Sequence, residues 1–107
     1  SKILGPWICD PSDQHCMPSM SIYHENGTLD FTAFRTNKCL EKIAVSKAEW
    51  HIEGGELIIT VTESKGEYVF PLGFIVKDRI VEIGEKNKIL LGTDEKKQIR
   101  LRSNQCL

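Results

Sequence analysis

Short strand-like segments separated by tight turns make up nearly the whole chain. Asn26-Gly27 and Gly54-Gly55 have the composition of tight turns, and β-branched or aromatic residues alternate with polar ones around them. No long helical segment separates the strand-like ones, which argues against a parallel α/β sheet. The pattern predicts an all-β fold, an antiparallel up-and-down β-barrel of eight to ten short strands. The expected strands are residues 3–9, 19–25, 28–35, 47–53, 56–63, 67–76, 79–85, 88–92 and 97–102.

An odd number of segments conflicts with closure, because a closed antiparallel meander needs an even number of strands. Residues 67–76 are where we expect the error. Pro71 cannot donate a ladder hydrogen bond, and Gly73 permits a sharp bend. This stretch is therefore expected to form two short strands, or one strand that turns a barrel corner.

Two other stretches interrupt the strand pattern. Residues 10–18 are rich in proline, aspartate and serine, which predicts a loop. Residues 36–46 carry Leu40, Ile43 and Ala44 at helical spacing, which predicts one or two turns of helix.

The alternation also predicts which side chains point into the barrel. Apolar residues at every second position form three such sets, on residues 28–35, 47–53 and 56–63. A barrel of this size has an interior just wide enough for side chains or one small ligand, so we expect aromatic residues mainly to fill it. The inward sets are Leu29, Phe31 and Ala33; Ala48, Trp50 and Ile52; and Leu57, Ile59 and Val61. The aromatic residues are Tyr23, Phe31, Phe34, Trp50, Tyr68, Phe70 and Phe74.

Length and composition indicate one ordinary globular domain spanning residues 1–107. The chain is 27% charged and 40% hydrophobic, and its net charge of −1 gives no electrostatic reason to expect a nucleic-acid partner. No apolar run approaches the ~20 residues that cross a bilayer, so no membrane span is expected. The first residue is not methionine and no signal peptide is recognisable, which suggests a trimmed, mature chain. Lysines 86, 88, 96 and 97 are interpreted as the solvated ends of hairpins.

Four cysteines in a small chain favour two disulfides and an oxidising compartment. The protein is therefore expected to be periplasmic or secreted, with anchoring at a surface as a variant. A tight hairpin at residues 25–28 would place Cys16 opposite residue 37, which favours Cys16–Cys39 and leaves Cys9–Cys106 across the barrel seam. The main alternative is a local Cys9–Cys16 bridge with Cys39–Cys106.

The same region crowds together residue types that bind metals, namely Cys9, Asp10, Asp13, His15 and Cys16. Structural zinc sites usually need a second cysteine or histidine pair, which the chain lacks. Disulfide formation explains the cysteines better, so no metal and no cofactor is expected. No nucleophile elbow, phosphate-binding loop or paired acidic motif is present, which argues against an enzyme.

The two ends of the chain resemble those of a known family. Gly5 and Trp7 open the first expected strand, and Arg100 and Arg102 lie in the last. A Gly-x-Trp opening answered by an arginine near the C-terminus resembles the lipocalin-like, or calycin, barrels, and most closely the small bacterial ones. The resemblance implies that the tryptophan packs across the closed end of the barrel with an arginine over its ring. It also implies a habit of binding small molecules.

These observations predict an exported, non-enzymatic protein that holds a small apolar or amphipathic molecule at the mouth of the barrel. The alternative is a protein-interaction module, such as an exported inhibitor or assembly subunit. Such a module would have a filled core and an exposed apolar patch around Met17, Pro18 and Met20. The residues expected at the mouth are Met17, Met20, Phe34, Leu40, Ile43, Tyr68 and Phe70.

Overall fold

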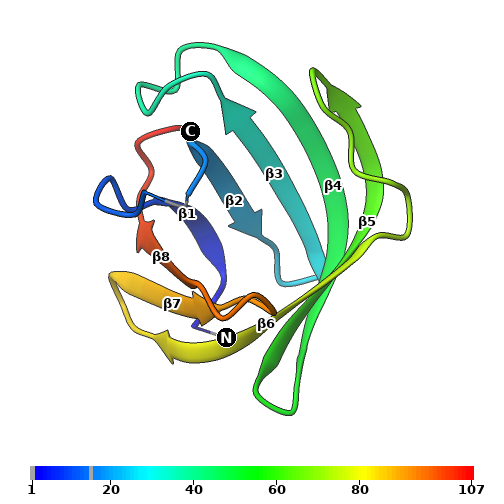
Figure 1. Ribbon diagram of the computed structural model, residues 1–107, viewed down its shortest axis with the longest axis vertical. Helices are drawn as coiled ribbons and strands as arrows, with labels where there is room; N and C mark the ends of the chain where they lie inside the picture. The colour runs from blue at the N-terminus through cyan, green and yellow to red at the C-terminus, as the bar shows by residue number, and fades with distance from the viewer. Residues whose placement is uncertain (1, 15) are drawn as a thin grey trace.

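The computed structural model, which describes residues 2–14 and 16–107, is a closed barrel of eight antiparallel strands (Figure 1). Each strand pairs with the next along the chain, and β1 pairs with β8 to close the sheet. The predicted all-β up-and-down barrel is confirmed. The strands are β1 (Gly5–Cys9), β2 (Ser19–Tyr23), β3 (Thr28–Phe34), β4 (Lys42–Glu53), β5 (Glu56–Gly66), β6 (Ile75–Ile83), β7 (Asn87–Leu91) and β8 (Lys97–Arg102).

The even strand number arises because one of the nine expected strands does not form as a separate strand. The strand predicted at residues 67–76 is wrong over most of its length, since residues 67–74 connect β5 to β6. Gly73 has a φ of 81° there, and its N–H donates to the carbonyl of Val61 at 2.8 Å. A proline and a left-handed glycine thus end the pairing, and β6 begins at Ile75.

The helix predicted within residues 36–46 is also wrong. Ile43 and Ala44 belong to β4, while Leu40 is 85% exposed in the connection that precedes it. Short apolar patterns fit a strand as well as a helix, and pairing with β3 and β5 selects the strand. Within the described part of the chain, no helix has the length and apolarity needed to span a membrane.

The main core fills one end of the barrel interior. Ile3, Trp7 and Leu57 are almost completely buried there, packed with Tyr23 and Leu90. Among the residues predicted to face inward, Leu29, Ala33, Ala48, Leu57 and Val61 are buried. Ile52 is instead 42% exposed, because it lies near the tip of the long β4–β5 hairpin, which extends past the barrel in Figure 1.

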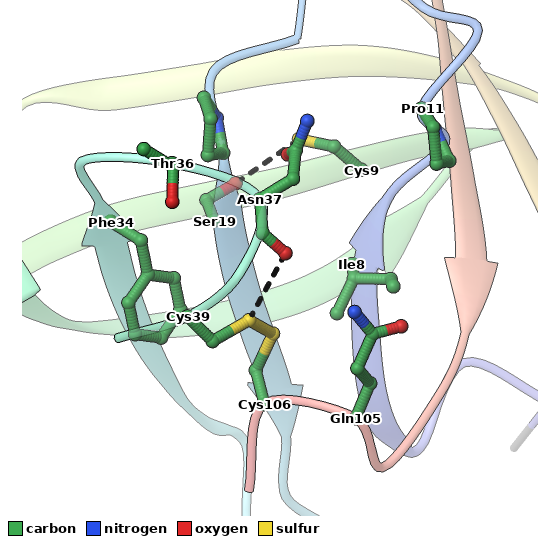
Figure 2. A pocket seen from close by; sticks show the side chains of 11 residues that line it. Ile8, Cys9, Pro11, Ser19, Phe34, Thr36, Asn37, Cys39, Gln105 and Cys106 are labelled. Atoms are coloured by element: carbon green, nitrogen blue, oxygen red, sulfur yellow. Dashed lines mark hydrogen bonds between the residues drawn. A yellow bond between two sulfur atoms is a disulfide. The ribbon is translucent and has the colours of Figure 1, made fainter. Parts of the chain in front are cut away.

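A second core lies on the outer face of β1, β2 and β3. Ile8, Met20 and Phe34 are buried in this cluster, and Cys39 and Cys106 pack against it. Figure 2 shows Cys106, in the segment after β8, joined to Cys39, with Ile8 and Phe34 beside the bridge. The space between these side chains is only about 40 Å³, so this region is a covered core rather than a binding cavity.

The disulfides are Cys9–Cys16 and Cys39–Cys106, with Cα atoms 5.8 Å and 5.5 Å apart. The favoured pairing of Cys16 with Cys39 and of Cys9 with Cys106 is therefore wrong, and the alternative is confirmed. The prediction of Cys16–Cys39 assumed that the β2–β3 pairing continues beyond Ser19 toward Cys16, but β2 begins at Ser19. Two disulfides are compatible with an oxidising, extracellular compartment.

Candidate functional site

The barrel encloses a cavity of about 260 Å³ that is partly open to solvent. Its walls come from every strand except β1, and from the segment between β5 and β6. The apolar lining is Leu29, Phe31, Ala48, Ile59, Val61, Phe70, Val76 and Leu90. The polar lining is Ser21, Tyr23, Ser46, Asp78, Lys88, Gln98 and Arg100. An apolar cavity with a few convergent polar groups is the usual form of a small-molecule site.

Trp7 closes the barrel at one end. Its indole N–H donates to the carbonyl of Ile3 at 2.8 Å, so the buried polar atom is satisfied. The guanidinium of Arg102 lies 4.3 Å from the ring centroid and also donates to the carbonyls of Lys2 and Leu4. Of the two arginines considered from the sequence, Arg102 thus covers the indole, whereas Arg100 lines the cavity.

Gly5 opens β1 in a conformation that glycine adopts readily. Its φ of 101° lies in a region that L side chains rarely adopt. A Cβ at this position would also lie 3.4 Å from Nη1 of Arg102. Glycine here therefore lets the arginine reach the N-terminal carbonyls.

Lys88 is the most unusual polar residue of the interior, with an exposed fraction of only 1%. It was interpreted from the sequence as a solvated hairpin end, and this is wrong: its position in β7 shares the inward face with Leu90. The ammonium donates to the hydroxyl of Tyr23 at 3.2 Å. It also lies 4.2 Å from the Tyr23 ring centroid and 4.9 Å from that of Trp7. Two aromatic faces and one hydroxyl thus replace the water that a lysine normally keeps.

Burial lowers the pKa of Lys88 to about 7, and the positive charge of Arg100 acts in the same direction while Asp78 opposes it. Burial also raises the pKa of the neighbouring Tyr23 hydroxyl. At neutral pH the interior therefore holds a lysine close to its midpoint of protonation beside a protonated tyrosine.

We expect the barrel to become more stable as pH rises from 7 to 9, because of Lys88. In the unfolded chain Lys88 recovers its ordinary pKa of 10.5, so the unfolded state binds more protons than the folded state above pH 7. The free energy of unfolding should then rise by up to about 1.4 kcal/mol per pH unit from this group. The cost of burying the charge is fully present below pH 7. Urea unfolding at half-unit intervals of pH measures the slope.

Lys88→Met is the matched variant, since it keeps the apolar stem over the two rings and removes the charge. Its stability should change much less with pH over the same range. The range stops at pH 9, below the ordinary pKa of Tyr23, so that tyrosine does not contribute. Parallel pH slopes for the two proteins would show that Lys88 does not titrate in the folded state near neutral pH.

Arg100 and Asp78 complete the polar part of the cavity. Arg100 lies directly opposite Lys88 in the β7–β8 ladder, and its Nη2 donates to Oε1 of Gln98 at 3.1 Å. Its Nη1 lies 3.6 Å from Oδ2 of Asp13, whose side chain is only 4% exposed. Asp13 comes from the loop that the Cys9–Cys16 bridge closes, and it also accepts a hydrogen bond from the Ile99 N–H at 3.0 Å.

The connection between β5 and β6 reaches the cavity through Phe70. The Phe70 N–H donates to Oγ of Ser64 at 3.0 Å, and its ring contacts those of Phe31, Tyr68 and Phe74. Phe70 is half-buried and lines the cavity, as the half-buried Phe31 also does. Phe31 and Phe70 thus form an aromatic part of the cavity wall.

The structure places the seven predicted mouth residues in three regions. Phe70 is part of the cavity wall. Met20 and Phe34 lie in the outer core beneath the C-terminal segment, away from the interior. Outside the cavity wall lie Met17, which contacts the Tyr68 hydroxyl, Tyr68 itself, the exposed Leu40, and Ile43 in β4. Of the seven residues, only Phe70, in the connection between β5 and β6, lines the cavity.

The loop of possible metal ligands is a disulfide-closed turn. Cys9 and Cys16 are bonded to each other, and Asp10 accepts hydrogen bonds from the N–H and hydroxyl of Ser12. Those hydrogen bonds lower the pKa of Asp10. His15 lies outside the described residues, so the prediction that this loop binds no metal stays a prediction.

No family model matches the chain, and no curated protein matches it significantly in sequence.

Proposed function

We propose that this protein is a non-enzymatic binding protein that holds one small amphipathic molecule inside the barrel. The observation that carries the proposal is the cavity itself, whose lining combines many apolar side chains with Lys88, Arg100 and Asp78 on the neighbouring strands β6, β7 and β8. The apolar part of a ligand would lie against Ile59 and Val61. Burial of that part would supply most of the affinity, and the polar groups would orient the ligand.

The cavity volume limits the ligand to a small molecule. An apolar cavity of ~150 Å³ in a protein core holds a benzene ring. A cavity of about 260 Å³ is larger, yet lies below the usual range for drug-sized ligands. A ligand of roughly ten non-hydrogen atoms is therefore the expected size.

Membership of the lipocalin-like barrels forms part of the same proposal. The closed eight-stranded meander and the arginine over Trp7 are what that resemblance implies for the fold and its closed end. Export to a periplasmic or extracellular compartment is the matching proposal for location, and it is supported by the two disulfides. The alternative, a protein-interaction module with a filled barrel, is less well supported because the interior contains a cavity.

A cavity-filling substitution tests the proposal. Octan-1-ol has the right size, and at about −0.6 kcal/mol per non-hydrogen atom it should bind with a Kd of about 100 µM. Val61→Phe puts a larger side chain into the wall of the cavity, where Val61 is 6% exposed. We expect this variant to weaken octan-1-ol binding at least tenfold, as measured by isothermal titration calorimetry.

Val81→Phe is the control. It makes the same change of side chain at a residue that is 53% exposed on the outside of the barrel. It should bind octan-1-ol as the unmodified protein does. If the unmodified protein shows no saturable binding, or if Val61→Phe binds as well as Val81→Phe, the cavity is not a binding site.

A further inference from the structure

Asp78 is a buried carboxylate that faces the cavity without a hydrogen bond. It lies on β6 with an exposed fraction of 6%, and within residues 2–14 and 16–107 its carboxylate meets no hydrogen-bond donor. Three polar side chains surround Gly92: a Cβ built there would lie 2.9 Å from Oδ1 of Asp94, 3.4 Å from Nε2 of Gln98 and 3.7 Å from Oδ1 of Asp78. Buried carboxylates are normally hydrogen-bonded. The carboxylate oxygens of Asp78 can therefore accept hydrogen bonds from a molecule in the cavity.

Hydrogen-bond donors line the neighbouring wall. Arg100 carries five N–H donors in a planar fork. Its two terminal nitrogens contact Gln98, Asp13 and a backbone carbonyl among the residues that the structure describes. Lys88 lies directly opposite Arg100 in the β7–β8 ladder, and its ammonium donates one hydrogen bond to the hydroxyl of Tyr23. Asp78, Arg100 and Lys88 are close enough that each shifts the pKa of another. The polar end of the cavity therefore offers acceptors and donors together.

The charges at this end balance. Arg100 is paired with Asp13, and the charges of Lys88 and Asp78 act on each other. One further group of each sign acts on this pair, Asp94 on Asp78 and Arg102 on Lys88. An added carboxylate would meet the charge of Asp78, and an added ammonium would meet Lys88 and Arg100. Either would bring an uncompensated charge into a cavity that is only partly open to solvent, which is costly.

From this arrangement we infer the chemical class of the ligand: a small apolar molecule that ends in an uncharged group able both to donate and to accept hydrogen bonds. A primary amide is the best match, with its N–H toward Asp78 and its carbonyl toward Arg100. Its chain would run along Ile59 and Val61 toward Phe70 and the surface. The inference rests on the proposed function, which it narrows to one kind of polar end.

Partial deprotonation of Lys88 near neutral pH makes the site more negative. Because burial lowers the pKa of Lys88 to about 7, raising the pH removes the cation that balances Asp78. Loss of that charge disfavours a carboxylate further and removes part of the repulsion that an ammonium would meet, whereas a neutral amide carries no charge for it to act on.

Three eight-carbon probes of matched size test the inference: octanamide, octanoate and octylammonium. Binding is followed at pH 6, below the pKa of Lys88, where the charges of the site balance, by the NMR shifts of backbone amides in the cavity wall. We expect octanamide to bind about tenfold tighter than either charged probe. In Asp78→Asn, which keeps the shape and removes the negative charge, octanamide should weaken and octanoate should strengthen, so that their ratio changes about tenfold.

Glu82→Gln makes the same kind of change at an exposed position of the same strand, and should leave all three affinities unchanged. If octanoate or octylammonium binds as tightly as octanamide to the unmodified protein, the inferred polar end is wrong while the proposed function stands. If none of the three probes gives saturable shifts in the cavity, the proposed function fails and the inference with it. The selectivity of the unmodified protein decides the matter even if Asp78→Asn does not fold.

Discussion

Replacing Trp7 with alanine is expected to lower the free energy of unfolding by about 4 kcal/mol, the usual cost of truncating a buried tryptophan. Trp7 is 1% exposed, packs in the main core and supports both Arg102 and Lys88 with its ring. Loss of the ring leaves Lys88 buried with only Tyr23 beneath it. A small domain has little stability to spare, so the variant should be close to unfolded at 37 °C. Urea or thermal unfolding with the disulfides intact measures the change.

Trp50→Ala is the comparison. Trp50 is only half-buried near the β4–β5 hairpin, although its indole N–H donates to the Thr28 carbonyl at 2.9 Å. We expect Trp50→Ala to lower the free energy of unfolding by about half as much as Trp7→Ala does, because it removes less buried apolar surface. A loss for Trp50→Ala equal to or greater than that for Trp7→Ala would contradict the role of Trp7 as the closure of the barrel.

Removal of the Cys39–Cys106 disulfide is the second large effect. The bridge joins residues 67 apart, and in the loop-entropy account it stabilises by about 4 kcal/mol. It also holds the C-terminal segment near the outer core of Ile8, Met20 and Phe34. The double variant Cys39→Ser with Cys106→Ser should therefore unfold at much lower urea concentration and bind a dye that reports exposed apolar surface.

The Cys9–Cys16 bridge supplies the control, because it spans residues only 7 apart. In the same loop-entropy account this bridge stabilises the fold by about 2.5 kcal/mol. The double variant Cys9→Ser with Cys16→Ser should therefore be more stable than the double variant Cys39→Ser with Cys106→Ser. The opposite order of stabilities would mean that the local bridge, through the loop that positions Asp13, matters more to the fold than closure of the long loop.

Much of the fold could be predicted because turns and alternation are local signals. Gly27, Gly54 and Gly55 all have positive φ at the two hairpins expected from their dipeptides. The alternation around Ala48 and Leu57 also pointed to the buried face correctly. Both signals depend only on neighbouring residues, and the barrel preserves them.

The disulfides could not be predicted in the same way, because their pairing depends on where a strand stops. The register at the β2–β3 hairpin pairs Tyr23 with Leu29 and Ser19 with Ala33, and β2 does not continue toward Cys16. The chain before Pro18 turns back instead, and the Asp10 N–H bonds to the Ile99 carbonyl on β8. A contact with the far end of the chain thus overrides a local extrapolation.

The polar part of the cavity was missed although one signal was present. Lys88 and Leu90 occupy alternate positions of β7, and the apolar Leu90 indicates that the face of Lys88 points inward. A charge on a strand face normally indicates that the face is solvated. Only the closure of the barrel by β1 and β8 brings Trp7 and Tyr23 against the ammonium of Lys88. Asp78 and Arg100 become part of the same site through that closure as well.

The central claim is that the barrel interior binds a small molecule, and nuclear Overhauser effects between a bound probe and the cavity methyls test it most directly. With octan-1-ol near saturation, the account predicts effects from its chain protons to the methyls of Ile59, Val61 and Leu90, which line the cavity. Effects confined to the exposed Val69 and Leu72, or none at all, would contradict it, because the molecule would then contact only the outside of the barrel.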